Sequence, residues 1–361
     1  MILPPPIRNT LRNNRIVRWL YFDCHFADIP VLLGVGSFNH QLNNALNEFM
    51  ATKELHDEEC IKETIKDVKR CFYRYKTTPQ EYFLFKFKHK SQEERASYIS
   101  DHIIMKLVAN KSGRKIHDTE LNNKFSFYTL NKDYFKRKAF FFNTQTTIDN
   151  FEKFVVASTR FIAKPNGAAL GNGVEIFNLQ NAEEIKKTFD YLKAQKIDYI
   201  LEDLIMQNEE MSEWNHSSVN TIRINSFLNN DQFNVLCPFI RTGRKGSIVD
   251  NGGQGGIFAS IDKKSGKIIT DGMDEKGNEF QFHPDSGIQY IGWQVPKWEE
   301  LIHLAEEIHR NMSKHNYISW DFALTDEGWV LIEGNWGEFV CQQMTNKRGY
   351  KNEFIQYLNV K

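Results

Sequence analysis

Residues 318–338, with the sequence ISWDFALTDEGWVLIEGNWGE, carry the strongest local pattern in the chain. Two apolar, alternating runs flank Asp326–Gly328, which predicts a β-hairpin with a three-residue loop closed by a left-handed glycine. Because strand side chains alternate between two faces, such a hairpin must turn one face to a core. The whole chain is therefore expected to contain a sheet built around this hairpin.

The other face of the predicted hairpin collects acidic and amide side chains. If Thr325 faces Trp329, then Asp321 lies opposite Glu333, and Asn335 shares the face of Glu333. The residues expected to point into the core are Phe322, Leu324, Val330 and Ile332. Two carboxylates and an amide oxygen are hard donors of the kind that Mg²⁺ prefers. The alternative is an ordinary hairpin with polar residues on its solvated face.

Composition limits the classes of protein that this chain can belong to. With 361 residues, 41% hydrophobic and 25% charged, it is an ordinary globular chain with room for about two or three domains. Lys+Arg and Asp+Glu both number 46, so no overall field attracts nucleic acid, and an anionic ligand needs a local basic cluster. Five scattered cysteines without a CxxC pair favour reduced thiols. We expect no membrane span, no signal peptide and a cytoplasmic location.

The first 115 residues predict a mostly helical region without a nucleotide-binding motif. Helices are expected over Asn43–Lys53, Asp57–Tyr75 and Arg95–Asn110. Ser91 and Glu94 have the spacing of a capping box at the start of the third helix.

Residues 161–177, FIAKPNGAALGNGVEIF, predict two strands joined by a glycine-rich loop, with Lys164 near the end of the first strand. Backbone N–H groups in such a loop can turn toward an anion, and Lys164 supplies a positive charge beside them. This favours a hairpin lid that closes over phosphates, whereas the alternative is a surface hairpin with a long loop. The loop residues assigned to this role are Asn166, Gly167, Gly171, Asn172 and Gly173.

A strand over Tyr199–Ile205 leads into an acidic connector. In a nucleotide site, the backbone of Leu204 and Ile205 can bind the edge of an adenine ring. Glu202 can accept a hydrogen bond from the exocyclic amine of the same ring. The ribose hydroxyls would go to Glu209 or Glu210. The alternative is a connector whose acidic residues are merely solvated.

The strand over 218–228 carries Arg223 in its middle, where a buried guanidinium needs a permanent anionic partner. Arg241, Arg244 and Lys245 follow and supply the local basic cluster that the neutral chain needs, unless they form a plain surface turn. A second glycine-rich loop over 251–256 ends at Gly255 and Gly256, where backbone can approach a ligand closely.

The order of these features resembles the ATP-grasp superfamily. In its carboxylate–amine ligases the metal ligands are an Asp, a Glu about twelve residues later and an Asn two further on, as in Asp321, Glu333 and Asn335. The segments VNTIRI, FIRTGRKGSIVDN, GGQGGI and SWDFAL…LIEGN resemble the sugar-transfer-associated ATP-grasp family more closely, over residues 80–345. The resemblance implies an α+β fold with two lobes around Mg-ATP (residues 116–210 and 211–361) after a helical region (residues 1–115).

The resemblance also implies a chemistry. ATP and two Mg²⁺ ions would be held by Asp321, Glu333 and Asn335, while Lys124 and Lys164 bind phosphates. The substrate would meet Arg223, Arg241, Arg244, Gly255 and Gly256, with Arg223, Arg241 and Lys164 in catalytic roles.

The implied reaction joins a carboxylate to an amine through an acyl phosphate, and the family resemblance implies an amine or amino acid joined to a uronic acid of a surface polysaccharide precursor. The alternatives are a peptide or natural-product amino-acid ligase, a kinase on the same fold, and a nucleotide-binding scaffold without turnover.

Overall fold

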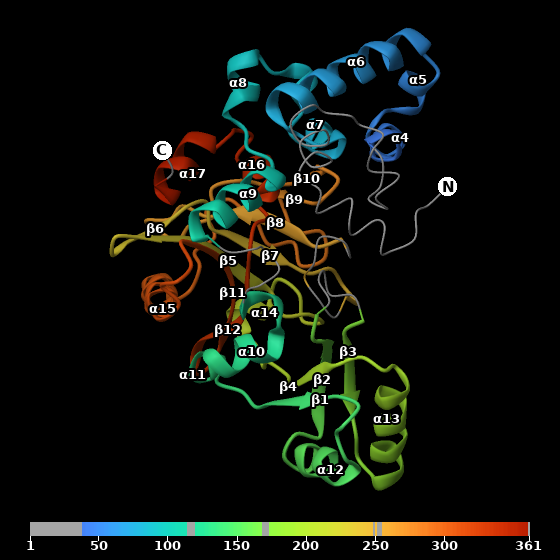
Figure 1. Cartoon of the computed structure of the whole chain (residues 1–361), viewed down its shortest axis with the longest axis vertical. Coiled ribbons are helices and arrows are strands. Elements are labelled where there is room, and N and C mark those ends of the chain that lie inside the picture. The colour runs from blue at the N-terminus through green and yellow to red at the C-terminus, as the bar shows by residue number, and fades with distance from the viewer. Residues whose placement is uncertain (1–37, 114–119, 168–172, 248–249, 251–254, 360–361) are drawn as a thin grey trace. The chain divides into compact units, whose positions relative to one another are not determined.

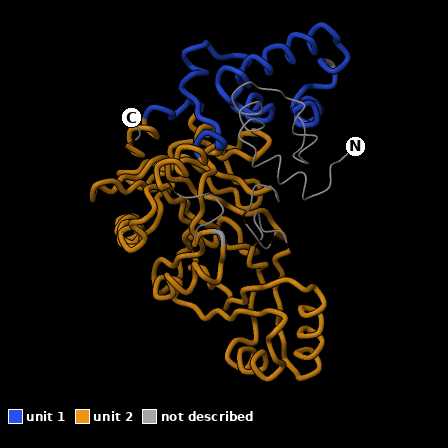
Figure 2. Tube along the Cα trace, viewed as in Figure 1, with its two compact units in different colours: residues 1–104, 347–352 blue, residues 105–346, 353–361 orange. Residues whose placement is uncertain are grey.

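The structure is a computed structural model that describes residues 38–113, 120–167, 173–247, 250 and 255–359. It divides into two compact units, coloured separately in Figure 2. Unit 1 comprises residues 1–104 and 347–352, and unit 2 comprises residues 105–346 and 353–361. None of the helices described is long and apolar enough to cross a membrane.

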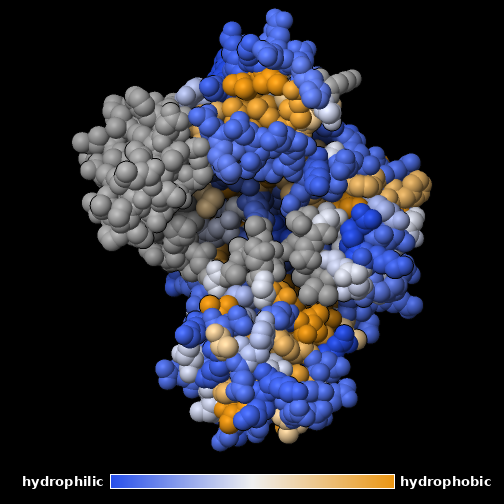
Figure 3. All heavy atoms as spheres, turned by 90° about the vertical axis from the view of Figure 1, so that its right-hand side faces the viewer, coloured by the Kyte–Doolittle hydropathy of each residue, from blue (hydrophilic) through white to orange (hydrophobic). Residues whose placement is uncertain are grey.

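Unit 1 is helical in its described part, as expected (Figure 1). Its elements are α4 (Phe38–Phe49), α5 (Thr52–Leu55), α6 (Glu58–Tyr75), α7 (Pro79–Leu84), η1 (Phe87–His89), α8 (Gln92–Ser97) and the start of α9 (Asp101–Ser112). The predicted capping box is present, since Ser91 Oγ accepts from Glu94 N at 3.2 Å and Glu94 Oε2 accepts from Ser91 N at 2.7 Å. Hydrophobic side chains gather on these helices on the face shown in Figure 3.

The single helix expected over Arg95–Asn110 is wrong, because α8 ends at Ser97 and α9 begins at Asp101. Tyr98 adopts an extended backbone, and Tyr98 and Ile99 are buried in the core of unit 1. Burial of two large side chains in the connection outweighs helix propensity, which is a weak preference.

Unit 2 contains a smaller sheet that carries the predicted lid hairpin. Its strands, in the antiparallel order β1-β4-β2-β3, are β1 (Ala139–Phe142), β4 (Tyr199–Asp203), β2 (Arg160–Pro165) and β3 (Glu175–Asn178). The helices α12 (Ile148–Ala157) and α13 (Ala182–Ala194) pack on this sheet through a core that includes Phe151, Phe161 and Leu192. The two strands expected within residues 161–177 are therefore confirmed.

The larger sheet of unit 2 has eight strands in the order β10-β9-β8-β7-β5-β11-β12, with β6 paired to β5. These are β5 (Thr221–Asn229), β6 (Gln232–Val235), β7 (Phe239–Thr242), β8 (Ile257–Ser260), β9 (Gly272–Met273), β10 (Glu279–Phe280), β11 (Tyr317–Thr325) and β12 (Gly328–Asn335). The remaining helices are η2 (Glu120–Asn122), α10 (Lys124–Leu130), α11 (Lys132–Phe135), α14 (Glu209–Ser212), α15 (Trp298–Asn311), α16 (Val340–Thr345) and α17 (Lys351–Leu358).

The two central strands β5 and β11 are buried almost throughout, and their side chains alternate in character. On one face Ile222, Ile224 and Trp320 join the main core, to which α15 also contributes. On the other face Arg223 and Asp321 form a cross-strand pair. The strand alternation read from the sequence thus places charged groups together on the face away from the main core.

The hairpin of β11 and β12 differs from the expectation in its turn. Thr325 pairs with Gly328 around a two-residue loop, and a bulge between Asp321 and Phe322 restores the pairing of Asp321 with Glu333. The expected three-residue loop is wrong, whereas the predicted pairing of the two carboxylates is confirmed. A bulge adds one residue to one strand and so shifts the register by one.

The same shift changes which side chains reach the core. Trp329 and Leu331, instead of the expected Val330 and Ile332, join Phe322 in the main core. On β12 the side chains between the bulge and the turn lie on the face opposite to the expected one, so Val330 is buried on the other face of the hairpin. On β11, Phe322 and Leu324 lie in the main core as expected. Ile332 lines a pocket beside Glu333.

His309 in α15 gives the main core a predictable pH dependence. Its Nδ1 lies 2.6 Å from Ser226 Oγ and its Nε2 lies 2.9 Å from the carbonyl oxygen of His315. Trp320 Nε1 donates to the same Ser226 hydroxyl at 2.7 Å. The hydroxyl therefore donates to Nδ1, and the neutral imidazole carries its proton on Nε2. Burial lowers the pKa of His309 to about 4.

Lowering the pH from 7 to 5 is expected to destabilise the protein through His309. Between pH 6.5 and 4 the unfolded histidine is protonated and the folded one is not, so stability falls as pH falls, by about 2 kcal/mol at pH 5. Urea unfolding, followed by tryptophan fluorescence at both pH values, measures the change. In His309→Gln this part of the loss should disappear, and an unchanged pH dependence in that variant would contradict the assignment.

Candidate active site

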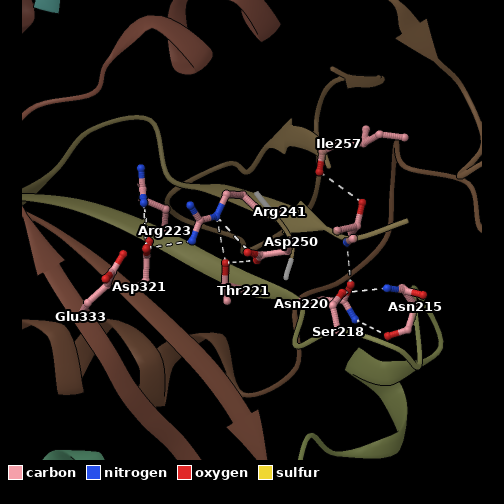
Figure 4. A network of polar contacts seen from close by, with 12 residues as sticks. Asn215, Ser218, Asn220, Thr221, Arg223, Arg241, Asp250, Ile257, Asp321 and Glu333 are labelled. Atoms are coloured by element: carbon pink, nitrogen blue, oxygen red, sulfur yellow. Dashed lines mark hydrogen bonds and ion pairs between the residues drawn. The ribbon is translucent and has the colours of Figure 1, made fainter. Parts of the chain in front are cut away.

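Asp321 on β11 is held by two arginines, Arg223 from the adjacent strand β5 and Arg241 from the next strand, β7 (Figure 4). Its Oδ1 accepts from Arg223 Nε at 2.6 Å, and its Oδ2 accepts from Arg223 Nη2 at 2.7 Å and from Arg241 Nη2 at 2.8 Å. Asp321 is fully buried. Burial alone would raise the pKa of Asp321, but the two guanidinium groups outweigh it and lower that pKa to about 2. The carboxylate is therefore ionised at every physiological pH.

Each of these arginines also contacts a second carboxylate. Arg223 Nη1 donates to Glu338 Oε2 at 2.6 Å, and Arg241 Nε lies 3.6 Å from Asp250 Oδ2. Thr221 connects the second pair, because its hydroxyl accepts from Arg241 Nε at 3.0 Å and donates to Asp250 Oδ2. Sequence reasoning did not assign Asp250, Glu338 or Thr221.

Thr221→Val is expected to lower the free energy of unfolding by about 1–3 kcal/mol, because a buried carboxylate and a guanidinium each lose a hydrogen-bond partner. Thr221→Ser keeps the hydroxyl and should stay close to wild type. Urea unfolding of the two variants measures the difference. Equal stability of the valine and serine variants would show that the hydroxyl does not hold Arg241.

Glu333 and Asn335 on β12 lie beside two lysines. Asn335 Nδ2 donates to Glu333 Oε1 at 3.0 Å. A pocket in unit 2 is lined by Leu121, Lys124, Phe127, Phe135, Lys164, Glu202, Ile332, Glu333, Gly334 and Asn335. Burial lowers the pKa of Lys124. The nearby Glu333 carboxylate raises this pKa and the Lys164 ammonium group lowers it further, but burial has the largest effect. The structure thus brings the predicted phosphate-binding lysines and two of the predicted metal ligands to one pocket.

The packing of Phe127 against β12 explains why the residue between Glu333 and Asn335 is a glycine, Gly334. A Cβ at this position would lie 2.9 Å from Cζ of Phe127, which is too close for a real contact. The Phe127 ring therefore packs directly on the backbone of β12. That packing joins α10, which begins at Lys124, to the strand that carries the acidic residues.

Glu202 is buried and shared by two cations. Its Oε1 accepts from Lys164 Nζ at 3.0 Å, and its Oε2 accepts from Arg137 Nε at 2.7 Å. Burial would raise the pKa of Glu202, but Arg137 and then Lys164 lower it overall. Arg137 also donates to the Leu331 carbonyl at 2.7 Å, so it connects the smaller sheet to β12.

Arg137 was missed by the sequence reasoning. Its position two residues before β1 becomes significant only once the pairing of Ala139 with Glu202 is known.

The lid loop is described in part, since Gly171 and Asn172 lie outside the described residues. Asn166 is buried, and its Oδ1 accepts from Phe125 N at 2.9 Å, which satisfies a donor at the start of α10. Gly167 and Gly173 flank the undescribed stretch, and Gly173 has φ +72°. Asn166 therefore connects the lid strand β2 to the helix that begins at Lys124.

The connector after β4 begins at Leu204, because β4 ends at Asp203 and not at Ile205 as expected. Leu204 and Ile205 are half-buried, and Glu210 is exposed on the first turn of α14. The backbone N–H of Asn208 donates to the Leu324 carbonyl at 2.9 Å, which ties the connector to β11.

The expected basic cluster of Arg241, Arg244 and Lys245 is divided in the structure. Arg241 turns toward Asp321, whereas Arg244 pairs with Asp285 at 2.7 Å, and the Lys245 backbone N–H donates to the same carboxylate. The reason is that β7 ends at Thr242, so strand alternation no longer governs Arg244. Gly255 and Gly256 precede β8, and a Cβ on Gly255 would lie 3.8 Å from Arg244 Cγ.

The donor set fits a magnesium ion. Three guanidinium N–H groups contact Asp321, and the side chain of Glu333 also lies within reach of this carboxylate, so the two acidic side chains converge. Around the two arginines stand four carboxylates, Asp250, Asp321, Glu333 and Glu338, which leaves an excess of negative charge. Glu333 and Asn335 add oxygen donors of the type that Mg²⁺ accepts. The described residues contain no group of three or more His, Cys, Asp or Glu arranged around a metal position.

Comparisons with solved structures return ATP-grasp proteins. D-alanine–D-alanine ligase from Bacillus anthracis is 10% identical, with a TM-score of 0.42 over 68% of this chain and 70% of that chain. N5-carboxyaminoimidazole synthetase from Staphylococcus aureus is also 10% identical, with a TM-score of 0.42 over 73% of this chain and 58% of that chain. No curated protein matches the chain.

Residues 117–358 match the family described as sugar-transfer associated ATP-grasp. The match covers both sheets of unit 2, including the lid strands, the arginine-bearing strand β5 and the hairpin of β11 and β12. The expected α+β ATP-grasp fold after a helical N-terminal region is confirmed. Because the match extends over most of its length, the chain belongs to the sugar-transfer associated ATP-grasp family.

Proposed function

We propose that the protein is an ATP-dependent, ADP-forming ligase that joins a carboxylate to an amine through an acyl phosphate. The observation that carries this proposal is the pairing of Asp321 with Glu333 beside a pocket that holds Lys124 and Lys164. Carboxylates and ammonium groups that line one pocket suit the metal-bound triphosphate of ATP.

Each group of this site has a role in the proposed reaction. Lys124 and Lys164 bind phosphate oxygens, and the buried pairing of Glu202 with Arg137 and Lys164 holds the second lysine in place. Magnesium, held by Asp321, Glu333 and Asn335, would neutralise charge on the β- and γ-phosphates. The lid after β2 excludes water, which would otherwise hydrolyse an acyl phosphate.

The reaction itself needs no nucleophilic side chain. An oxygen of the substrate carboxylate attacks the γ-phosphorus, the bond to the β-phosphate oxygen breaks, and ADP leaves. The amine then attacks the acyl carbon, and phosphate leaves to give the amide. Arg223 and Arg241 lie beside Asp321, and in this proposal they stabilise negative charge on the transferring phosphoryl group and on the tetrahedral intermediate.

The proposed substrate class is suggested by the description of the family. The sugar-transfer association of the family supports a uronic acid or glycan precursor as the carboxylate, with an amine or amino acid as its partner. A kinase on the same fold would release ADP with a hydroxyl acceptor and would need no amine.

An ADP-release screen tests the proposal. Pools of uronic acids and other carboxylates are combined with pools of amines and amino acids, and each pool is then omitted in turn. Release that requires both a carboxylate and an amine is expected. If ADP forms with a hydroxyl acceptor alone, the protein is a kinase and not a ligase. If the protein binds ATP but no pool yields ADP, it is a nucleotide-binding scaffold without turnover.

A further inference from the structure

The two arginines beside Asp321 differ in how their second carboxylate is held. Asp250, the partner of Arg241, is buried, with 8% of its side chain exposed, and is hydrogen-bonded to Thr221. Glu338, the partner of Arg223, has 55% of its side chain exposed although Arg223 itself has only 5%. One carboxylate is therefore fixed in the protein interior, whereas the other reaches the buried guanidinium from solvent.

Arg223 is held in place without help from Glu338. Asp321 binds its Nε and Nη2, and the Phe239 ring lies 5.8 Å from the guanidinium carbon. Glu338 takes only the remaining nitrogen, Nη1, at 2.6 Å. Another oxyanion could thus replace Glu338 on Nη1 while the guanidinium keeps its position.

The backbone of Glu338 is unusual for its residue type. It has φ +62° directly after Gly337 at φ +87°, in the left-handed region that costs a side-chain-bearing residue about 1–2 kcal/mol. Its carbonyl accepts from the buried Gln342 at 3.2 Å, so the main chain is anchored while the side chain extends to Arg223.

We propose that Nη1 of Arg223 is the oxyanion subsite of this protein, and that Glu338 occupies it until the anion of the substrate arrives. The ligand class is a carboxylate or phosphate oxyanion, and its identity as the substrate carboxylate rests on the proposed function. Glu338 then acts as a specificity gate, because only an anion that outcompetes an internal carboxylate for Arg223 enters the subsite. Removing the Glu338 carboxylate should therefore tighten anion binding.

Binding of inorganic phosphate to ADP-saturated protein tests this inference, since ADP fills the positions beside Lys124 and Lys164. Isothermal titration calorimetry compares wild type, Glu338→Ala and Glu338→Gln. Glu327→Gln, in the exposed hairpin loop, makes the same charge change away from the site. We expect phosphate to bind at least about tenfold more tightly to Glu338→Ala than to wild type, with Glu338→Gln between them and Glu327→Gln unchanged.

The salt dependence separates direct competition from a distant charge effect. In about 0.5 M KCl, charges in solvent that are more than about 4 Å apart are screened from each other. The difference in phosphate affinity between Glu338→Ala and wild type should persist under these conditions. Equal affinities, a difference that vanishes in salt, or no phosphate binding by either protein would overturn the gate. None of these results depends on an amide being formed, so they are distinguishable from failure of the proposed ligase reaction.

Discussion

Replacing Glu333 with alanine is expected to lower ATP-dependent turnover by about a thousandfold or more and to leave the fold intact. Loss of a metal ligand removes several kcal/mol of charge stabilisation from phosphoryl transfer. Glu333 is only half-buried, and its hydrogen-bond partner Asn335 is half-buried beside it, so the variant leaves no polar group sealed from water. Steady-state ADP release and urea unfolding measure the two effects separately.

Glu327→Ala is the matched control, because it removes the same side chain from the exposed loop of the same hairpin. It should retain both activity and stability. If Glu333→Ala unfolds while Glu327→Ala does not, the acidic group on β12 supports the fold rather than a metal. Full activity in Glu333→Ala would show that the hairpin is not part of the catalytic site.

Replacing Arg223 with methionine is expected to lower the free energy of unfolding by about 3–5 kcal/mol. Methionine fills much of the same volume but leaves the fully buried Asp321 without two of its three donors. Urea unfolding of unit 2, followed by tryptophan fluorescence, measures the loss.

Asp321→Asn in the Arg223→Met background should recover part of that stability, because it removes the buried charge that lacks its partner. No recovery in the double variant would show that packing against Phe239, rather than charge pairing, makes Arg223 important.

Much of unit 2 could be predicted from its sequence because its strands have a clear period of two. The alternation of Val219–Phe227 and of the hairpin placed Arg223 and Asp321 on the correct face. The bulge beside Asp321 was not predictable, since a two-residue and a three-residue loop fit the same hydrophobic pattern equally well. Val330 and Ile332 were consequently assigned to the wrong side.

The partners of the charged residues were the least predictable part of the site. Arg137 reaches Glu202 through a strand pairing across 65 residues, and Arg223 reaches Asp321 across 98 residues. Glu338 lies near Glu333 in sequence, but its contact with Arg223 depends on a left-handed backbone that nothing in its residue type favours. Local pattern therefore located the strands, whereas the long-range pairings appeared only in three dimensions.

The measurement that tests the central claim most directly follows an oxygen isotope through the reaction. The carboxylate substrate found by the ADP-release screen is labelled with ¹⁸O in its carboxyl group, and the inorganic phosphate formed with ATP, Mg²⁺ and the amine is analysed by mass spectrometry. An acyl phosphate transfers one carboxyl oxygen to phosphate, so labelled phosphate is expected in an amount equal to the amide formed. Unlabelled phosphate, or amide formed without transfer of label, would contradict the proposed ligase reaction.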